Sequence, residues 1–266
     1  MNTQNLITGV VIFVMAMSMG CQVKNPPKHN FMATAMIRSE MRREYPQWFM
    51  RPPLSESTQW AVGYCSTYFR QEESLAQAVQ DGIHRLGQSL AVRVTGERIF
   101  LNDNLGWRLI GEKFEITVPE AVIEDAKERH KVVQTYVDKH LTLVLVSLSD
   151  AAEQLSLSNT HAPMPDKPKW VEQPPQQPGY LYAQGHCDWY YHEEEAWEAA
   201  ERNALISLAL ARQMKLRKWL TQWNEWTEAI STERTDVLLE GIQVVARWRD
   251  DKTKDHYVLI RMRLAL

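Results

Sequence analysis

Two stretches of alternating large and small residues, each followed by a stretch with a helical repeat, dominate the hydrophobic pattern of the chain. In the first, residues 58–64 (TQWAVGY) alternate with a period of two, which predicts a β-strand with large side chains on one face and small ones on the other. Residues 71–90 then carry small and apolar side chains at spacings of three and four, which predicts an α-helix packed on the small-residue face. This helical stripe consists of Leu75, Ala78, Gly82 and Leu86.

The same pattern returns 122 residues later without a gap. Gly63 and Cys65 correspond to Gly185 and Cys187, and a Trp precedes a Pro-Pro pair in both stretches. A long internal repeat of this kind predicts that one structural module is built twice. The helical stripe of the second copy consists of Trp197, Ala200, Ala204 and Leu208.

Each half ends in a predicted β-hairpin. Residues 132–137 and 141–148 form the first hairpin, and residues 241–248 and 257–264 form the second. The stretch 141–148 (LTLVLVSL) is nearly all apolar, which predicts a strand that is central or buried on both faces. The predicted fold class is therefore α+β, with two tandem copies of a small module in which a helix packs on an antiparallel sheet, after a lipoprotein signal peptide.

The segments between these elements set the predicted boundaries. Residues 91–101 are expected to be extended, and Thr117, three residues before Glu120, predicts a capped start for a second helix in the first half. A Pro-rich stretch separates the two halves. The predicted parts are a signal peptide at 1–20, a lipidated cysteine and tether at 21–45, a first module at 46–150, a linker at 151–167 and a second module at 168–266.

The N-terminus carries an export signal. Residues 6–20 form an apolar run that is too short to span a bilayer and that ends in small or flexible residues before Cys21. Ser18 to Cys21 resembles the lipobox of bacterial lipoproteins, which implies that Cys21 receives diacylglycerol and a further acyl chain such as palmitate. A transmembrane anchor and a cleaved secretory signal are the alternatives. Gln22 in place of Asp resembles the choice that sends lipoproteins to the outer membrane, on its periplasmic side.

The composition narrows the classes of partner. The chain is 44% hydrophobic and 24% charged, with a formal net charge of -3, which gives no electrostatic basis for binding nucleic acid. The sequence contains no Gly-rich phosphate loop and no nucleophile motif, so we expect a protein that is not an enzyme and that needs no cofactor. The expected partners are the membrane, through the lipid, and another envelope protein or a second copy of the chain.

Three groups of residues are candidates for specific roles. Cys65 and Cys187 occupy equivalent positions, and they form either a disulfide or two separately buried thiols. His186, Cys187, His192 and the acidic run 193–195 could suggest a metal site, but the first copy has Tyr64 and Arg70 where the second has these histidines, and the spacing matches no zinc pattern, so we expect no metal site. A stripe of Trp219, Trp223 and Trp226 is either a core face or a docking surface for a partner.

The order Pro46-x-Trp48-Phe49-x-x-Pro52-Pro53, then Ala61-Val62-Gly63, an acidic helix and a terminal pair of strands resembles the LPP-twenty lipoprotein family and its relatives in flagellar assembly, FlgP and the N-terminal domain of FlgT. The resemblance covers most of the chain after the signal. It implies an outer-membrane lipoprotein that is a structural or assembly component of the cell envelope, in some members attached to the flagellum, with no catalytic residues. The alternative is a lipoprotein regulator or adaptor that contacts a cell-wall synthesis factor.

Overall fold

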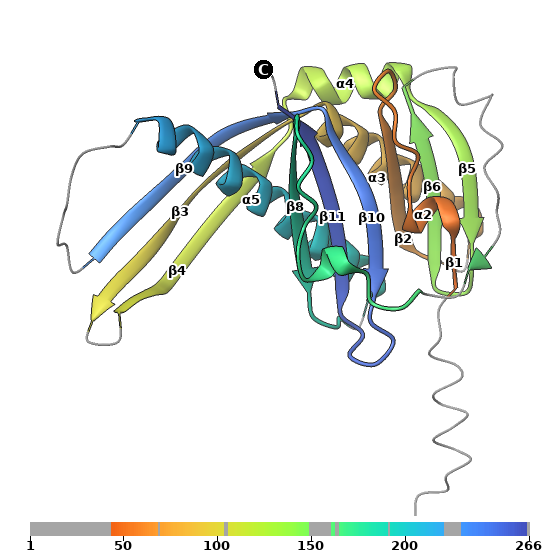
Figure 1. Cartoon of the computed structure of the whole chain (residues 1–266). Helices are drawn as coiled ribbons and strands as arrows, with labels where there is room; N and C mark the ends of the chain where they lie inside the picture. The colour runs from red at the N-terminus through yellow and green to blue at the C-terminus, as the bar shows by residue number, and fades with distance from the viewer. Residues whose placement is uncertain are drawn as a thin grey trace, which may run out of the picture. The chain divides into compact units, whose positions relative to one another are not determined.

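The strands predicted from the hydrophobic pattern belong to two three-stranded antiparallel sheets (Figure 1). The first contains β2 (Trp60–Ser66), β6 (Leu141–Ser147) and β5 (Lys131–Val137) in the order β2-β6-β5. The second contains β10 (Ile242–Arg249), β11 (His256–Arg263) and β8 (Tyr180–Cys187) in the order β10-β11-β8. Both predicted hairpins are confirmed, and β6 is central and buried along its whole length.

A computed structural model of the chain describes residues 44–68, 70–103, 106–148, 161–162, 165–190, 192–220 and 230–264. Within them the fold is α+β, as predicted, with four α-helices, three three-stranded antiparallel sheets and a short pairing of β1 (Tyr45–Pro46) with β7 (His161–Ala162). None of the described helices is both long enough and apolar enough to cross a membrane.

One long helix packs on each of the first two sheets. In the first half this is α3 (Gln71–Leu90), whose bounds match the prediction, and in the second half it is α5 (Glu193–Leu220). A Cβ atom on Gly63 of β2 would lie 2.6 Å from the Gly82 Cα of α3, and one on Gly185 of β8 would lie 2.9 Å from the Ala204 Cα of α5. Only glycine allows this close approach of strand and helix backbones.

The third sheet joins the two halves of the chain. It consists of β4 (Gly106–Thr117), β3 (Ala91–Asp103) and β9 (Ile230–Glu240) in the order β4-β3-β9, so β3 of the first half pairs along its length with β9 of the second. The sequence predicted only the extended stretch 91–101, because no local pattern identifies a partner so far away in the chain. The free end of this sheet exposes Trp107, Leu109 and Ile110 of β4.

A second helix of the first half, α4 (Glu120–Arg129), is present as predicted, but it begins after Pro119 and not after Thr117. The capping prediction was wrong, because Pro119 occupies the N-cap and no side chain bonds to the free N–H groups there. Ala126 of α4 packs with α3 in a small apolar cluster on the face of the first sheet that α3 covers. The helix therefore covers the part of α3 that the sheet does not reach.

The main hydrophobic core contains residues from both halves. Phe49 lies on the short helix α2 (Gln47–Met50), and its ring meets Tyr64 of the first half and Trp197 of the second edge to face, at centroid distances of 6.2 and 5.3 Å. The short 3-10 helix η2 (Lys169–Val171) adds Val171, which is buried. Because the aromatic cluster spans the halves, separating them would expose this core to water.

Candidate functional site

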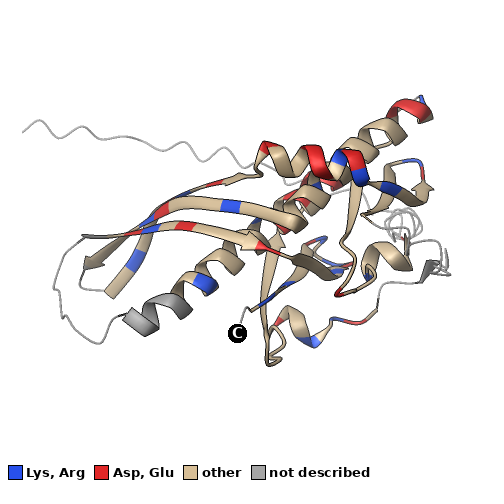
Figure 2. Ribbon diagram, turned by 90° about the horizontal axis from the view of Figure 1, so that it is seen from above, with Lys and Arg blue, Asp and Glu red and all other residues tan. Residues whose placement is uncertain are grey.

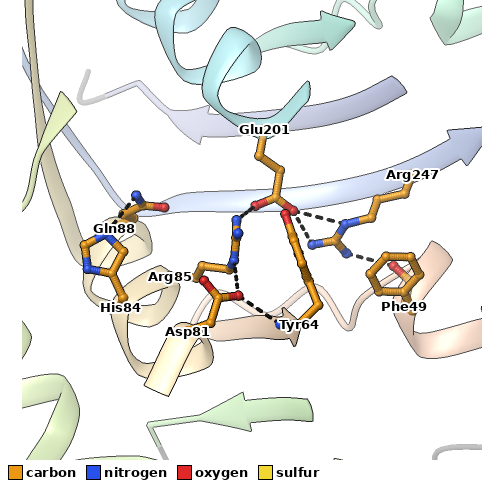
Figure 3. A network of polar contacts seen from close by, with 8 residues as sticks. All are labelled: Phe49, Tyr64, Asp81, His84, Arg85, Gln88, Glu201 and Arg247. Carbon is orange, nitrogen blue, oxygen red and sulfur yellow. Dashed lines mark hydrogen bonds and ion pairs between the residues drawn. The ribbon is translucent and has the colours of Figure 1, made fainter. Parts of the chain in front are cut away.

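A buried carboxylate between two guanidinium groups connects the two halves of the chain (Figure 3). Glu201 of α5 accepts hydrogen bonds from Arg85 of α3 through Oε2 and from Arg247 of β10 through Oε1, the latter at 2.5 Å from Nη2 and 3.1 Å from Nε. The side chains of Arg85 and Arg247 are 9% and 1% exposed. Charged groups this deeply buried need an oppositely charged partner and hydrogen bonds, and Glu201 provides both for Arg85 and Arg247.

The free edge of β2 fixes the position of Arg85. Asp81, one turn before Arg85 on α3, accepts the backbone N–H of Tyr64 at 2.8 Å and the Arg85 Nε at 2.6 Å. The guanidinium of Arg85 lies 3.9 Å from the centroid of the Tyr64 ring. Asp81 thus pairs the N–H group of Tyr64 at the sheet edge. Because Arg85 lies one helical turn after Asp81, the same carboxylate also orients the Arg85 guanidinium toward α5.

Arg247 is held from the other side of the network. Its Nη1 donates to the backbone oxygen of Phe49 at 2.8 Å, and its guanidinium lies 4.6 Å from the centroid of the Phe49 ring. Arg247 therefore links the N-terminal helix α2 to β10 and α5. Each side-chain nitrogen of Arg247 thus meets an acceptor, with Nε and Nη2 sharing Oε1 of Glu201.

The network keeps its charges in fixed states. Burial alone would raise the pKa of Glu201, but the adjacent charges and hydrogen bonds of Arg85 and Arg247 outweigh it and lower the pKa below its ordinary value. Burial raises the pKa of Tyr64 well above its ordinary value, against the opposing charge of Arg85. The carboxylate is therefore ionised and the phenol neutral near pH 7, and both carboxylate oxygens are engaged. This arrangement suits a structural clamp better than acid–base catalysis.

A polar groove with a volume of about 370 Å³ opens beside the clamp, between α3, α5 and β4. Its walls contain Asp81, Arg85, Glu198 and Glu201, and Arg202 crosses it to donate to the backbone oxygen of Phe114 at 2.8 Å. The only histidine in its lining, as far as the chain is described, is His84, whose Nε2 lies 3.3 Å from the Gln88 Nε2. The lining offers no pair of nucleophile and base among these residues.

This network was not predicted from the sequence. Glu201 stands where the first copy has Val79, and Arg85 stands where the second has Ser207, so the repeat contains no matching pair. The available signal was a charged residue inside an apolar helical stripe, since Glu201 lies four residues after Trp197 and three before Ala204. Such a position predicts a buried charge that needs a partner, but it does not identify that partner.

Cys65 and Cys187 are both buried free thiols in the structure, and they belong to different hydrophobic clusters. Cys65 donates to the backbone oxygen of Ser74 at 3.1 Å, and Cys187 donates to that of Asp188 at 3.2 Å. Burial raises the pKa of Cys65 to about 11 and raises that of Cys187 as well. Of the two alternatives left open by the sequence, this arrangement corresponds to separate thiols, each facing its own helix.

The remaining candidate residues are only partly within the described chain. Cys21, Trp223 and Trp226 lie outside the described residues, and Trp219 belongs to the last turn of α5, where only the backbone is described. The docking surface and the lipidated cysteine therefore stay predictions. His192 lies 3.9 Å from Glu194 and is not brought together with His186.

Figure 2 shows Lys and Arg interspersed with Asp and Glu along the described strands and helices. No family model, curated protein or solved structure matches the chain. The function of the chain is therefore inferred from its sequence signals and from the geometry of the site.

Proposed function

We propose that the protein is a lipoprotein anchored in the outer membrane through Cys21 and that it serves as a structural or assembly component of the cell envelope, without enzymatic activity. The apolar run before Cys21 and the lipobox-like sequence support the anchor. The resemblance to the LPP-twenty family supports the structural role and favours a place near the flagellum.

We also propose that the chain after the tether consists of two tandem copies of one module. Equivalent residues make equivalent contacts: Gly63 meets α3, and Gly185 meets α5. Asp81 bonds to the backbone of Tyr64, and its counterpart Asn203 bonds to the backbone of His186, the counterpart of Tyr64, at 2.8 Å. In both sheets the first strand lies at an edge beside the last strand of its half.

The observation that carries the structural role is the clamp of Arg85, Glu201 and Arg247 within a shared core. Two modules joined by a flexible linker alone would move independently. Here a buried ion network, a sheet with strands from both halves and a common aromatic cluster hold their surfaces in one fixed arrangement. A component that positions other envelope proteins needs such rigidity, whereas an enzyme needs a reactive set of groups that the groove does not offer.

The anchor is tested by labelling cells with radioactive palmitate and by fractionating their membranes. The wild-type protein is expected to incorporate label and to sediment with the outer membrane, and the Cys21→Ser variant is expected to do neither. The matched control is Cys65→Ser, which leaves the signal intact. Label in the Cys21→Ser variant would contradict the proposal.

The structural role is tested by cross-linking in cells, followed by identification of the cross-linked proteins. We expect envelope assembly proteins or a second copy of this chain, and loss of these products in the Cys21→Ser variant. Recovery of a cell-wall synthesis enzyme as the main product would favour the adaptor function instead. A correctly anchored protein that cross-links to nothing would contradict both.

A further inference from the structure

The C-terminal end of β8 brings three metal-ligating side chains together. The Nε2 atom of His186 lies 3.5 Å from Oδ1 of Asp188 and 3.7 Å from Oδ2 of Asp255, and the three donor atoms all lie within 4.8 Å of one another. His186 ends the exposed face of β8, Asp188 follows the strand, and Asp255 precedes β11, which pairs with β8. The topology of the hairpin, and not the local sequence, creates this group.

The separations suit a small divalent ion. Zinc binds imidazole nitrogen and carboxylate oxygen at about 2.0 to 2.2 Å, so two ligand atoms on a tetrahedral ion lie about 3.4 Å apart. The two distances from His186 are close to that value without an ion. One nitrogen and two carboxylate oxygens form a set that borderline transition ions accept and that Mg²⁺ fits less well.

The fold supports the ring of His186 and the turn that carries Asp255. The imidazole of His186 stacks on the Tyr257 ring at a centroid distance of 4.6 Å and an angle of 28°. The backbone oxygen of Asp255 accepts the Asp250 N–H at 2.9 Å, which closes the turn before β11. A site whose ligands are already oriented loses less entropy when an ion binds.

We propose that His186, Asp188 and Asp255 bind one divalent transition ion of the zinc class. The set is confined to the second half of the chain, since Tyr64 and Ser66 occupy the positions equivalent to His186 and Asp188. Cys187 points to the opposite face of β8 and is not a ligand. Three protein ligands at an open surface leave a coordination position for water or for a side chain of a partner.

The first experiment titrates the full-length protein, purified in detergent without a polyhistidine tag, with Zn²⁺ by isothermal calorimetry. One ion per chain is expected to bind, and a tenfold excess of Mg²⁺ over Zn²⁺ is expected not to displace it. His186→Gln and Asp255→Asn should each weaken Zn²⁺ binding by at least about tenfold, the scale seen when metal-site residues are removed. His192→Gln, a nearby exposed histidine outside the site, should bind as the wild type does.

The site does not depend on the proposed function, and its test has its own control for folding. The side chain of Asp188 is 87% exposed, so Asp188→Asn should leave the circular dichroism spectrum and the urea midpoint unchanged while weakening Zn²⁺ binding. Absence of saturable Zn²⁺ binding in the wild type would overturn the proposal. So would equal affinity in the wild type, His186→Gln and Asp188→Asn.

Discussion

Strands β2 and β8 are equivalent in sequence, but their outward faces have different environments. We call the face of each strand that packs on the helix of its own half the inward face, and the opposite face the outward face. On the inward faces, Gly63 allows α3 and Gly185 allows α5 to approach closely. On the outward faces, β2 carries the buried residues Trp60, Val62 and Tyr64, whereas β8 carries the partly or fully exposed Tyr182, Gln184 and His186. The inward face is determined by the packing of each half on its own helix. The outward face is determined by what the rest of the chain places against it.

This difference explains why β2, and not β8, packs its outward face against the other half of the chain. The outward face of β2 packs against α2, α5 and β10, and the clamp around Glu201 lies at its edge. The equivalent face of β8 is polar and partly exposed, and at its start the Tyr180 hydroxyl donates to Glu56 at 3.0 Å. The polar face of β8 therefore offers no apolar surface of the kind that β2 presents to the other half of the chain.

The largest expected effect comes from breaking the clamp. Glu201→Gln removes the charge that compensates Arg85 and Arg247 while both stay buried, and loss of one partner from a buried ion network costs about 3 to 5 kcal/mol. The free energy of unfolding, measured by urea denaturation, should fall by that amount. Glu195→Gln, an exposed position on the same helix, should change it by less than about 0.5 kcal/mol. Equal stability of the two variants would show that the clamp does not hold the halves together.

The next largest effect concerns the inward faces, where the two strands should respond alike. Gly63→Ala and Gly185→Ala each place a Cβ atom against helix backbone that cannot move aside, which should cost about 3 kcal/mol in each case. Gly111→Ala is the control, because the nearest atom to its Cβ would be 4.0 Å away. Differential scanning calorimetry should show lower melting temperatures for the first two variants only. A large loss at one glycine and none at the other would break the equivalence of the inward faces.

Several of these features could be predicted from sequence and others could not. Helix α3 and both hairpins follow from local periodicity, because the faces of a helix or strand are set by neighbours within a few residues. The pairing of β3 with β9 and the bond from Arg85 to Glu201 join residues more than a hundred positions apart. Periodicity shows that such a residue is buried, but the partner depends on how the two halves dock.

A smaller effect should appear in the dependence of stability on pH. The pKa of Glu201 is lowered in the folded protein, so its contribution is present above the unfolded pKa of about 4.3 and is lost as the pH falls through the folded value. The wild type should therefore lose stability more steeply below about pH 4.3 than Glu201→Gln does. Urea midpoints measured from pH 7 to pH 3 test this difference. Parallel curves for the two proteins would mean that Glu201 titrates normally.

The smallest effect concerns the two thiols. Burial raises the pKa of Cys65 to about 11, so few molecules carry the reactive thiolate near pH 8. Iodoacetamide should modify Cys65 much more slowly in the native protein than in urea, as followed by mass spectrometry. Rapid labelling of the native protein would contradict the buried position. A mass of the unfolded, unreduced protein that indicates a bond between Cys65 and Cys187 would establish the disulfide alternative.

The most direct test exchanges one outward-facing residue between the two strands. Val62 of β2 is 2% exposed, and its counterpart on β8 is the partly exposed Gln184. Val62→Gln buries an amide without a partner and should lower the free energy of unfolding by about 2 kcal/mol or more, whereas Gln184→Val should change it by less than about 0.5 kcal/mol. Urea denaturation of both variants measures this contrast. Equal losses in the two variants would contradict the claim that the outward face of β2, unlike that of β8, packs between the two halves.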